Sequence, residues 1–131
     1  MPRTFDDATT TGMPRSFLRP ILLLLLAERD SHGYELLEQV TELGLERTDT
    51  GGLYRALRAM EQEGLVTSTW EPSTSGPARR RYALSEEGLD WLHASAGSLR
   101  EIVRHLQTYL HRYAALERQL DGRATTEDGA R

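Results

Sequence analysis

Residues 49–66 read DTGGLYRALRAMEQEGLV, and this stretch decides the fold. Two adjacent glycines, Gly51 and Gly52, stand where a helix would begin, although a glycine inside a helix costs about 1 kcal/mol relative to alanine. After them, apolar residues return at the spacing of a helix rather than of a strand. The side chains that share this apolar face are Leu53, Ala56, Leu57 and Met60. We therefore expect an amphipathic helix whose apolar face lies in the core.

The opposite face of the expected helix contains no acidic residue. Its members are Gly51, Tyr54, Arg55, Arg58 and Gln62. In the first turn of a helix the N–H groups lack intrahelical partners, so Gly51 and Gly52 would leave their amides open to an anion such as a phosphate. Thr48 and Thr50 add hydroxyl donors beside the same helix end, and the hydroxyl of Tyr54 can donate to a phosphate. Arg55 and Arg58 are long enough to reach guanine edges or phosphates in a major groove.

A second interpretation of the same helix is purely structural. The glycines would be tolerated in a first turn, and the arginines would only solvate a surface. The surrounding sequence favours the DNA-binding interpretation, because a preceding helix and a following arginine-rich hairpin flank this stretch.

The flanking segments predict a winged helix-turn-helix. Two helices are expected before the central one, at residues 16–29 and 32–43. Alternating residues then predict two strands, 66–71 and 79–84, joined by the turn-rich loop PSTSGPA. A final helix is expected from its cap at Ser85 to about residue 120. The fold class is therefore mainly α with a small β-hairpin, followed by a long C-terminal dimerisation helix.

Capping and breaking residues set the expected ends of these helices. The expected caps are Asp30 or Ser31 for the second helix and Asp49 or Thr50 for the central one. The expected stops are Gly44 and Gly64. The chain then divides into a flexible N-terminal arm (1–15), a DNA-binding domain (16–84), a dimerisation helix (85–120) and a flexible tail (121–131). Because MPRSF at Met13 repeats MPRTF at Met1, both methionines are candidate translation starts.

A cationic block, Arg79, Arg80 and Arg81, occupies the second strand. Alternation places Arg80, Tyr82 and Leu84 on one face, and we expect Tyr82 and Leu84 to pack on the domain. Arg79 and Arg81 take the other face, where they would contact a phosphate or the minor groove. The alternative is a solvated run of charge.

The final helix repeats apolar residues at heptad spacing. The seam consists of Leu89, Leu92, Ala96, Leu99, Val103, Leu106, Leu110, Tyr113 and Leu120. Such a seam on a helix of this length needs a partner surface. The helix at 16–29 can cover part of it, and a second copy of the chain is the expected cover for the rest. A symmetric homodimer would also place two recognition helices roughly 34 Å apart, one turn of DNA.

Composition narrows the functional classes. The chain has 131 residues, no cysteine and a formal net charge of -4, and all 16 of its basic residues are arginine. The absence of cysteine excludes a disulfide scaffold and a cysteine nucleophile, and it fits a cytoplasmic location. The longest apolar run, ILLLLLA at 21–27, is too short to cross a membrane. The net negative charge argues weakly against nucleic-acid binding, although an acidic protein can carry a positive face.

Nothing in the sequence supports catalysis or a bound cofactor. We find no carboxylate pair, phosphate loop or nucleophile–base spacing, so an enzyme is not expected. The histidines form no tight cluster of metal ligands, and His32, which precedes a helix, is expected to be a cap or surface residue. Trp70 and Trp91 are candidates for an aromatic effector pocket near the dimer seam, with ordinary packing as the alternative.

Three stretches of the chain resemble the PadR family of bacterial transcription regulators. They are LRPILLLLLAERDSHGYELLEQV, GGLYRALRAMEQEGLV and GPARRRYALSEEGLDWL. The resemblance implies a homodimeric winged-helix repressor that binds a palindromic operator and responds to small aromatic or cationic compounds. By position, it implies that Tyr54 is the recognition-helix tyrosine and that Arg80 and Tyr82 are the wing arginine and tyrosine. Arg55 stands where the family often has proline, so base specificity is expected to differ.

Two hypotheses follow from the sequence. The first is a dimeric, sequence-specific DNA-binding regulator that works in the cytoplasm and associates with the nucleoid when bound. The second is a winged-helix module that binds a protein partner through the same helix and wing. The acid-free face of the central helix favours duplex DNA over a protein.

Overall fold

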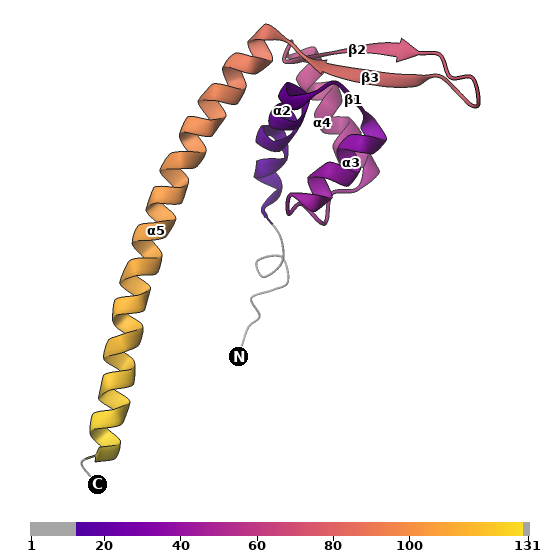
Figure 1. Ribbon diagram of the computed structural model, residues 1–131. Helices are drawn as coiled ribbons and strands as arrows, with labels where there is room; N and C mark the ends of the chain where they lie inside the picture. Colours follow the sequence, from indigo (N-terminus) through magenta and orange to yellow (C-terminus); the bar gives the residue numbers. More distant parts are fainter. Residues whose placement is uncertain (1–12, 130–131) are drawn as a thin grey trace. The chain divides into compact units, whose positions relative to one another are not determined.

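A computed structural model describes residues 13–129 (Figure 1). The chain divides into two compact units, Met1–Ser95 and Ala96–Arg131. Residues 1–12 of the expected N-terminal arm and residues 130–131 of the expected tail lie outside the described part. The elements are η1 (Arg15–Phe17), α2 (Leu18–Glu28), β1 (Ser31–His32), α3 (Gly33–Glu42), α4 (Thr50–Gln62), β2 (Val66–Glu71), β3 (Arg79–Leu84) and α5 (Glu86–Gly129).

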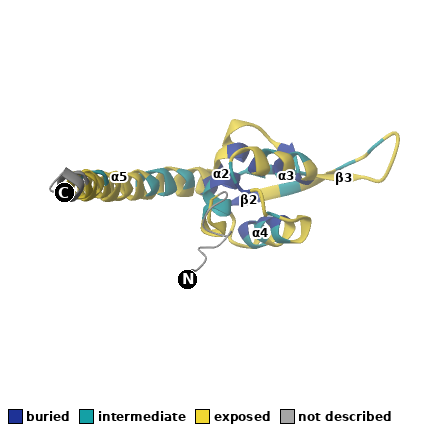
Figure 2. Ribbon diagram, turned by 90° about the horizontal axis from the view of Figure 1, so that it is seen from below, coloured by how far each residue is buried: buried dark blue, intermediate teal, exposed yellow. Residues whose placement is uncertain are grey.

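The core of the first unit is built by the apolar faces of α2, α3 and α4. The predicted core face of α4 is confirmed, because Leu53, Leu57 and Met60 are fully buried and Ala56 packs against the same cluster. Figure 2 shows the buried residues on these helices. The other large, fully buried apolar side chains are Leu22, Leu23, Leu36, Val40, Leu65 and Val66. Because burying one such side chain contributes about 1.5–3 kcal/mol, this cluster holds the three helices together.

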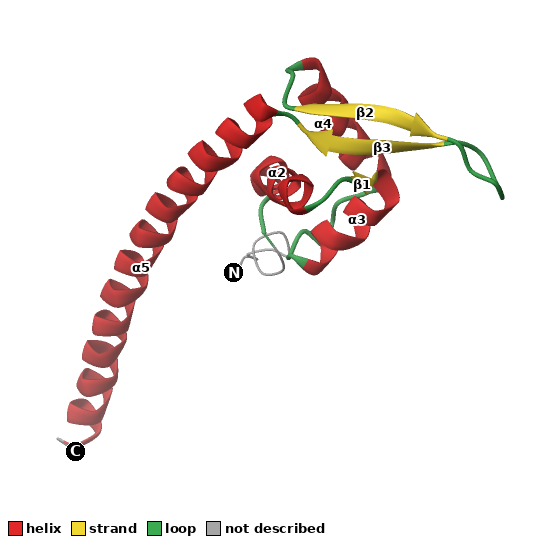
Figure 3. Cartoon of the chain, turned by 45° about the horizontal axis from the view of Figure 1, so that its top comes forward, coloured by secondary structure: helices red, strands yellow, loops and turns green. Residues whose placement is uncertain are grey.

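The predicted hairpin is confirmed, and β2 and β3 have the expected bounds. They pair antiparallel from Val66↔Leu84 to Glu71↔Arg79. One further strand, β1, pairs with β3, so the sheet order is β1-β3-β2 (Figure 3). Strand β1 was not predicted, because a strand of two residues is too short for its alternation to be detected. It joins the start of α3 to the middle of the hairpin.

The cap of α3 differs from the prediction. Asp30 or Ser31 was the expected cap, and this is wrong, because His32 occupies the N-cap position. The backbone N–H of His32 donates to Oε1 of Glu35 at 2.9 Å, and Ser31 is instead buried in β1. The separate expectation that His32 is a cap or surface residue is confirmed.

Glycines end α3 and α4 where the sequence predicted. Gly44 has a φ of 110° and Gly64 a φ of 81°, in the left-handed region that favours glycine. Leu43, the last residue of the helix expected at 32–43, is 44% exposed. The reason is that α3 ends at Glu42, so that Leu43 is the C-cap rather than part of the buried face.

The last helix, α5, begins as predicted and continues beyond its predicted end. Oγ of Ser85 accepts a hydrogen bond from the N–H of Gly88 at 3.0 Å, as expected of a cap. The predicted end near Leu120 is wrong, because the helix continues to Gly129. In the second unit, the large apolar side chains exposed on the helix are Ile102, Val103, Leu106, Tyr109, Leu110, Tyr113, Leu116 and Leu120. Across residues 13–129, no helix is long and apolar enough to cross a bilayer.

We predict that Gly88→Ala destabilises the protein and that Gly97→Ala does not. A Cβ at Gly88 would collide with the backbone oxygen of Leu65, whereas a Cβ at Gly97 would meet nothing within 4 Å. We expect Gly88→Ala to lower the free energy of unfolding by about 1–3 kcal/mol. In the same helix, Gly97→Ala should raise it by roughly 0.5–1 kcal/mol. Urea denaturation measures both, and equal stabilities of the two variants would contradict this packing.

Candidate nucleic-acid interface

The outward face of α4 presents two arginines and a tyrosine at the surface. Arg55, Arg58 and Gln62 are exposed, and Tyr54 is 37% exposed. The opposite face of the helix is fixed in the core by its leucines and methionine. Since the helix cannot rotate without exposing those side chains, the guanidinium groups of Arg55 and Arg58 remain in solvent.

The glycine pair at the start of α4 makes room for a helix cap. Oδ1 of Asp49 accepts a hydrogen bond from the N–H of Gly52 at 2.7 Å, which confirms Asp49 as one of the two expected caps. A Cβ at Gly52 would lie only 2.9 Å from that oxygen. Gly51 is exposed, and a Cβ there would lie 3.1 Å from Nη1 of Arg55. One of the amides that we expected to face a phosphate is therefore already hydrogen-bonded to a carboxylate.

Three arginines line one cavity beside this end of α4. A cavity of about 240 Å³ is lined by Arg15, Leu18, Arg47, Thr48, Asp49, Gly52 and Arg55. Three guanidinium groups and one carboxylate leave this lining positively charged. Sequence reasoning selected Arg55 but missed Arg15 and Arg47, because one lies in the segment expected to be a flexible arm and the other lies in a loop. Of the two threonines predicted as hydroxyl donors, Thr48 is half-buried and Thr50 is exposed.

Tyr54 packs against the start of α3. A Cβ at Gly33 would collide with the hydroxyl and ring of Tyr54, so the helices can approach this closely only with a glycine there. Gly33 is buried in consequence. This contact gives Tyr54 a structural role between the two helices, in addition to the phosphate contact that the sequence predicts for it.

Two wing arginines lie over aromatic rings. The guanidinium carbon of Arg80 lies 5.1 Å from the ring centroid of Trp70, its neighbour across the hairpin. Nη1 of Arg79 donates a hydrogen bond to the hydroxyl of Tyr34 at 3.0 Å. Both arginines are exposed. Tyr82 is only 4% exposed, which confirms that it packs on the domain, and burial raises the pKa of its hydroxyl.

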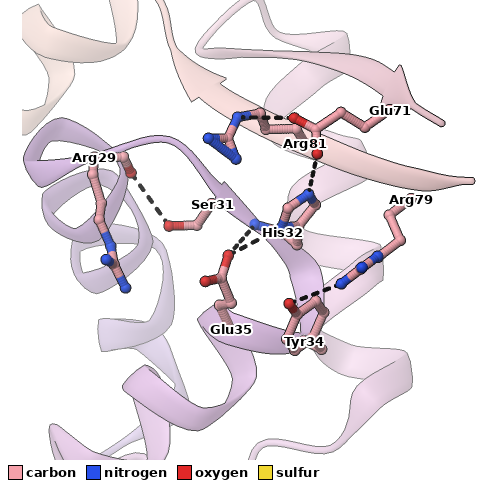
Figure 4. A network of polar contacts seen from close by, with 8 residues as sticks. All are labelled: Arg29, Ser31, His32, Tyr34, Glu35, Glu71, Arg79 and Arg81. Carbon is pink, nitrogen blue, oxygen red and sulfur yellow. Dashed lines mark hydrogen bonds and ion pairs between the residues drawn. The ribbon is translucent and has the colours of Figure 1, made fainter. Parts of the chain in front are cut away.

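His32 connects the start of α3 to the wing (Figure 4). Its Nε2 lies 2.8 Å from Oε1 of Glu71, and its Nδ1 lies 3.2 Å from Oε1 of Glu35. The backbone hydrogen bond from His32 lowers the pKa of Glu35, and the side-chain hydrogen bond from His32 lowers the pKa of Glu71. Glu71 also pairs with Arg81, whose Nε lies 3.4 Å from Oε2. Within the described residues, no group of three or more potential metal ligands occurs.

A larger cavity lies where α3, α4 and the wing meet. It measures about 370 Å³ and is lined by His32, Gly33, Tyr34, Tyr54, Arg58, Glu61, Trp70, Ala78, Arg79, Arg80 and Tyr82. This junction cavity brings Arg58 of α4 together with Arg79 and Arg80 of the wing, although they are distant in sequence. Trp70 borders the cavity and is 63% exposed, whereas Trp91 on α5 is not part of its lining. The two tryptophans are thus not brought together in this cavity.

The first unit matches a known protein family. The profile of the transcriptional regulator PadR-like family matches residues 21–94. A curated relative, the transcriptional regulator YqjI of Escherichia coli strain K12, is 28% identical over 92 residues. That match covers 69% of this chain and 42% of the relative, so the chain spans less than half of the relative's length.

Solved structures of regulators of this type share the fold. A PadR family transcription regulator from Clostridium difficile R20291 is 30% identical with a TM-score of 0.65, and the match covers 72% of this chain and 98% of that one. A PadR-like regulator from Bacillus cereus strain ATCC 14579 is 25% identical with a TM-score of 0.67, covering 73% and 93%. Members of this family are transcriptional regulators rather than enzymes. With its mainly helical winged fold and its match over residues 21–94, the chain belongs to the PadR-like family of transcriptional regulators.

Proposed function

We propose that this regulator binds duplex DNA directly through α4 and the β2–β3 wing. The outward stripe of α4 supports this proposal, because Arg55 and Arg58 are exposed there and no acidic residue lies between them. A helix fits the width of a major groove, and one arginine can donate two hydrogen bonds to a guanine. Arg58 is suited to base reading because it lies in the middle of α4 and borders the junction cavity.

Phosphate contacts would flank the base-reading side chains. Arg15, Arg47 and Arg55 line the cavity at the N-terminus of α4, and Arg79 and Arg80 line the junction cavity from the wing. Contacts of this kind hold a protein in register on the duplex but carry no sequence information. The arrangement therefore supports a recognition helix with cationic groups on both sides of it.

We predict that Arg58→Ala weakens binding to the protein's own operator by about 1–3 kcal/mol, because one bidentate base contact would be lost. The melting temperature should stay unchanged, since Arg58 is exposed and lies outside the core. The matched control is Arg100→Ala, which removes the same charge from an exposed position on α5. Mobility-shift titration and circular dichroism measure the two effects. Equal affinities for the two variants would remove Arg58 from the proposed interface.

The proposed functional form is a homodimer joined by the seam of α5. The second unit exposes a row of apolar side chains at heptad spacing, of which Val103 is 51%, Leu106 56% and Leu110 58% exposed. A row of this length is unfavourable in water and would be covered by the same row of a second copy. A two-fold dimer would carry two copies of α4, which suits an operator with two inverted half-sites.

We predict that Leu106→Glu converts the dimer into monomers, because it would bury an unpaired carboxylate between two helices. The matched control is Thr108→Glu, which introduces the same charge on the opposite side of α5, outside the seam. Sedimentation equilibrium at micromolar concentration distinguishes the two species. A Leu106→Glu variant that still sediments as a dimer would show that the seam is not the interface.

The proposed regulatory role is repression in the cytoplasm, with release by a small aromatic or cationic effector. It is supported by the resemblance of the chain to PadR regulators rather than by a defined effector site. The alternative, a module that binds a protein through the same surface, is favoured by the 63% exposure of Trp70, because aromatic residues are enriched in protein interfaces. Selection from a pool of random duplexes separates the two roles. Retention of one sequence supports DNA binding, and retention of none favours a protein partner.

A further inference from the structure

Tyr34 makes an unusually well-defined set of contacts for an exposed side chain. It is the second residue of α3 and is 49% exposed. Its hydroxyl accepts the hydrogen bond from Nη1 of Arg79 at 3.0 Å, and the guanidinium carbon of Arg79 lies 5.6 Å from its ring centroid. Two interactions thus fix one arginine of the wing, although a free arginine on a surface samples many rotamers.

The ring of His32 holds Tyr34 in place. The two rings stack, with centroids 5.7 Å apart and planes at 10°. The His32 side chain is only 12% exposed and lies between the carboxylates of Glu35 on α3 and Glu71 on β2. Figure 4 shows these residues, with dashed lines that join Glu71 to His32 and Tyr34 to Arg79. The orientation of Arg79 is therefore tied to both the helix and the wing.

Arg79 lies at the loop end of the paired strands of the wing. It is the first residue of β3, and its pair with Glu71 is the last of the hairpin ladder before the loop. Arg81, further from the loop, pairs with Glu71, so part of its charge is offset by a carboxylate. Arg79 is also attracted by the Glu71 carboxylate, but its side chain is oriented by the neutral hydroxyl and ring of Tyr34, which take up none of its positive charge.

We propose that Tyr34 is a positioning residue that preorients Arg79 toward a DNA phosphate beside the recognition helix. This inference rests on the proposed DNA-binding function. Tyr34 borders the junction cavity together with Arg58 and Arg79, so the oriented guanidinium group faces the same space as the proposed base-reading arginine. Holding the side chain ready lowers the ordering cost of forming the contact.

The test is a comparison of the salt dependence of operator binding for the wild type, Tyr34→Phe, Arg79→Ala and the double variant. Each phosphate contact contributes about 0.9 to the slope of log affinity against log salt concentration. We expect Arg79→Ala to reduce the slope by roughly that amount. We expect Tyr34→Phe, which keeps the ring and changes no charge, to weaken binding about three- to tenfold and to reduce the slope in the same direction.

The double variant separates positioning from a general structural role. If Tyr34 acts through Arg79, adding Tyr34→Phe to Arg79→Ala should cause no further loss of affinity. Tyr109→Phe, at an exposed tyrosine of α5, is the matched control and should bind like the wild type. Thermal melts of all variants should coincide, because each change removes atoms of an exposed side chain.

Four outcomes would overturn the inference. Wild-type affinity and slope in Tyr34→Phe would mean that the hydroxyl does not position Arg79, and tighter binding would mean that it holds Arg79 away from DNA. An equal loss from Tyr34→Phe with and without Arg79 would mean that the effect does not pass through the arginine. Failure of the wild-type protein to bind any duplex would overturn the proposed function as well, so the two failures are distinguishable.

Discussion

The burial of Leu53, Leu57 and Met60 is the interaction on which the rest of the structure depends. All three are fully buried, on one side of α4, so their packing fixes the rotation of the helix about its axis. A rotation by one residue, about 100°, would carry Arg58 toward the core, and an unpaired buried charge costs several kcal/mol. The exposure of the cationic stripe is therefore a consequence of apolar packing, and no ionic partner is needed to produce it.

Two glycines and a histidine arrange the charges around that stripe. Gly33 allows the ring of Tyr54 to lie against the start of α3, which brings the helices close, and Gly52 leaves space for the Asp49 cap. His32 then joins α3 to β2, and the wing is attached to the helices at the same place. These contacts bring arginines from separate segments to the two cavities beside α4, so a chain with a net charge of -4 concentrates positive charge there.

The features of the fold that depend on a short run of residues could be predicted from the sequence. The bounds of β2 and β3, the Asp49 cap and the core face of α4 each follow from a short run of residues. The end of α5 could not, because its apolar repeat stops at Leu120 while the helical backbone continues. Arg15, Arg47 and Tyr34 were missed for a different reason: each gains its importance from a neighbour distant in the chain, and no periodicity in a single sequence reveals such a contact.

The most direct test of the central claim is the affinity of the wild-type protein for its selected duplex between low and moderate salt. Arginines that contact phosphates displace condensed counterions, so several such contacts per copy predict a steep, linear fall of log affinity with log salt concentration. We predict that fall, with a slope that corresponds to several phosphates. An affinity that stays flat across the same range, or the absence of any measurable binding at low salt, would contradict it.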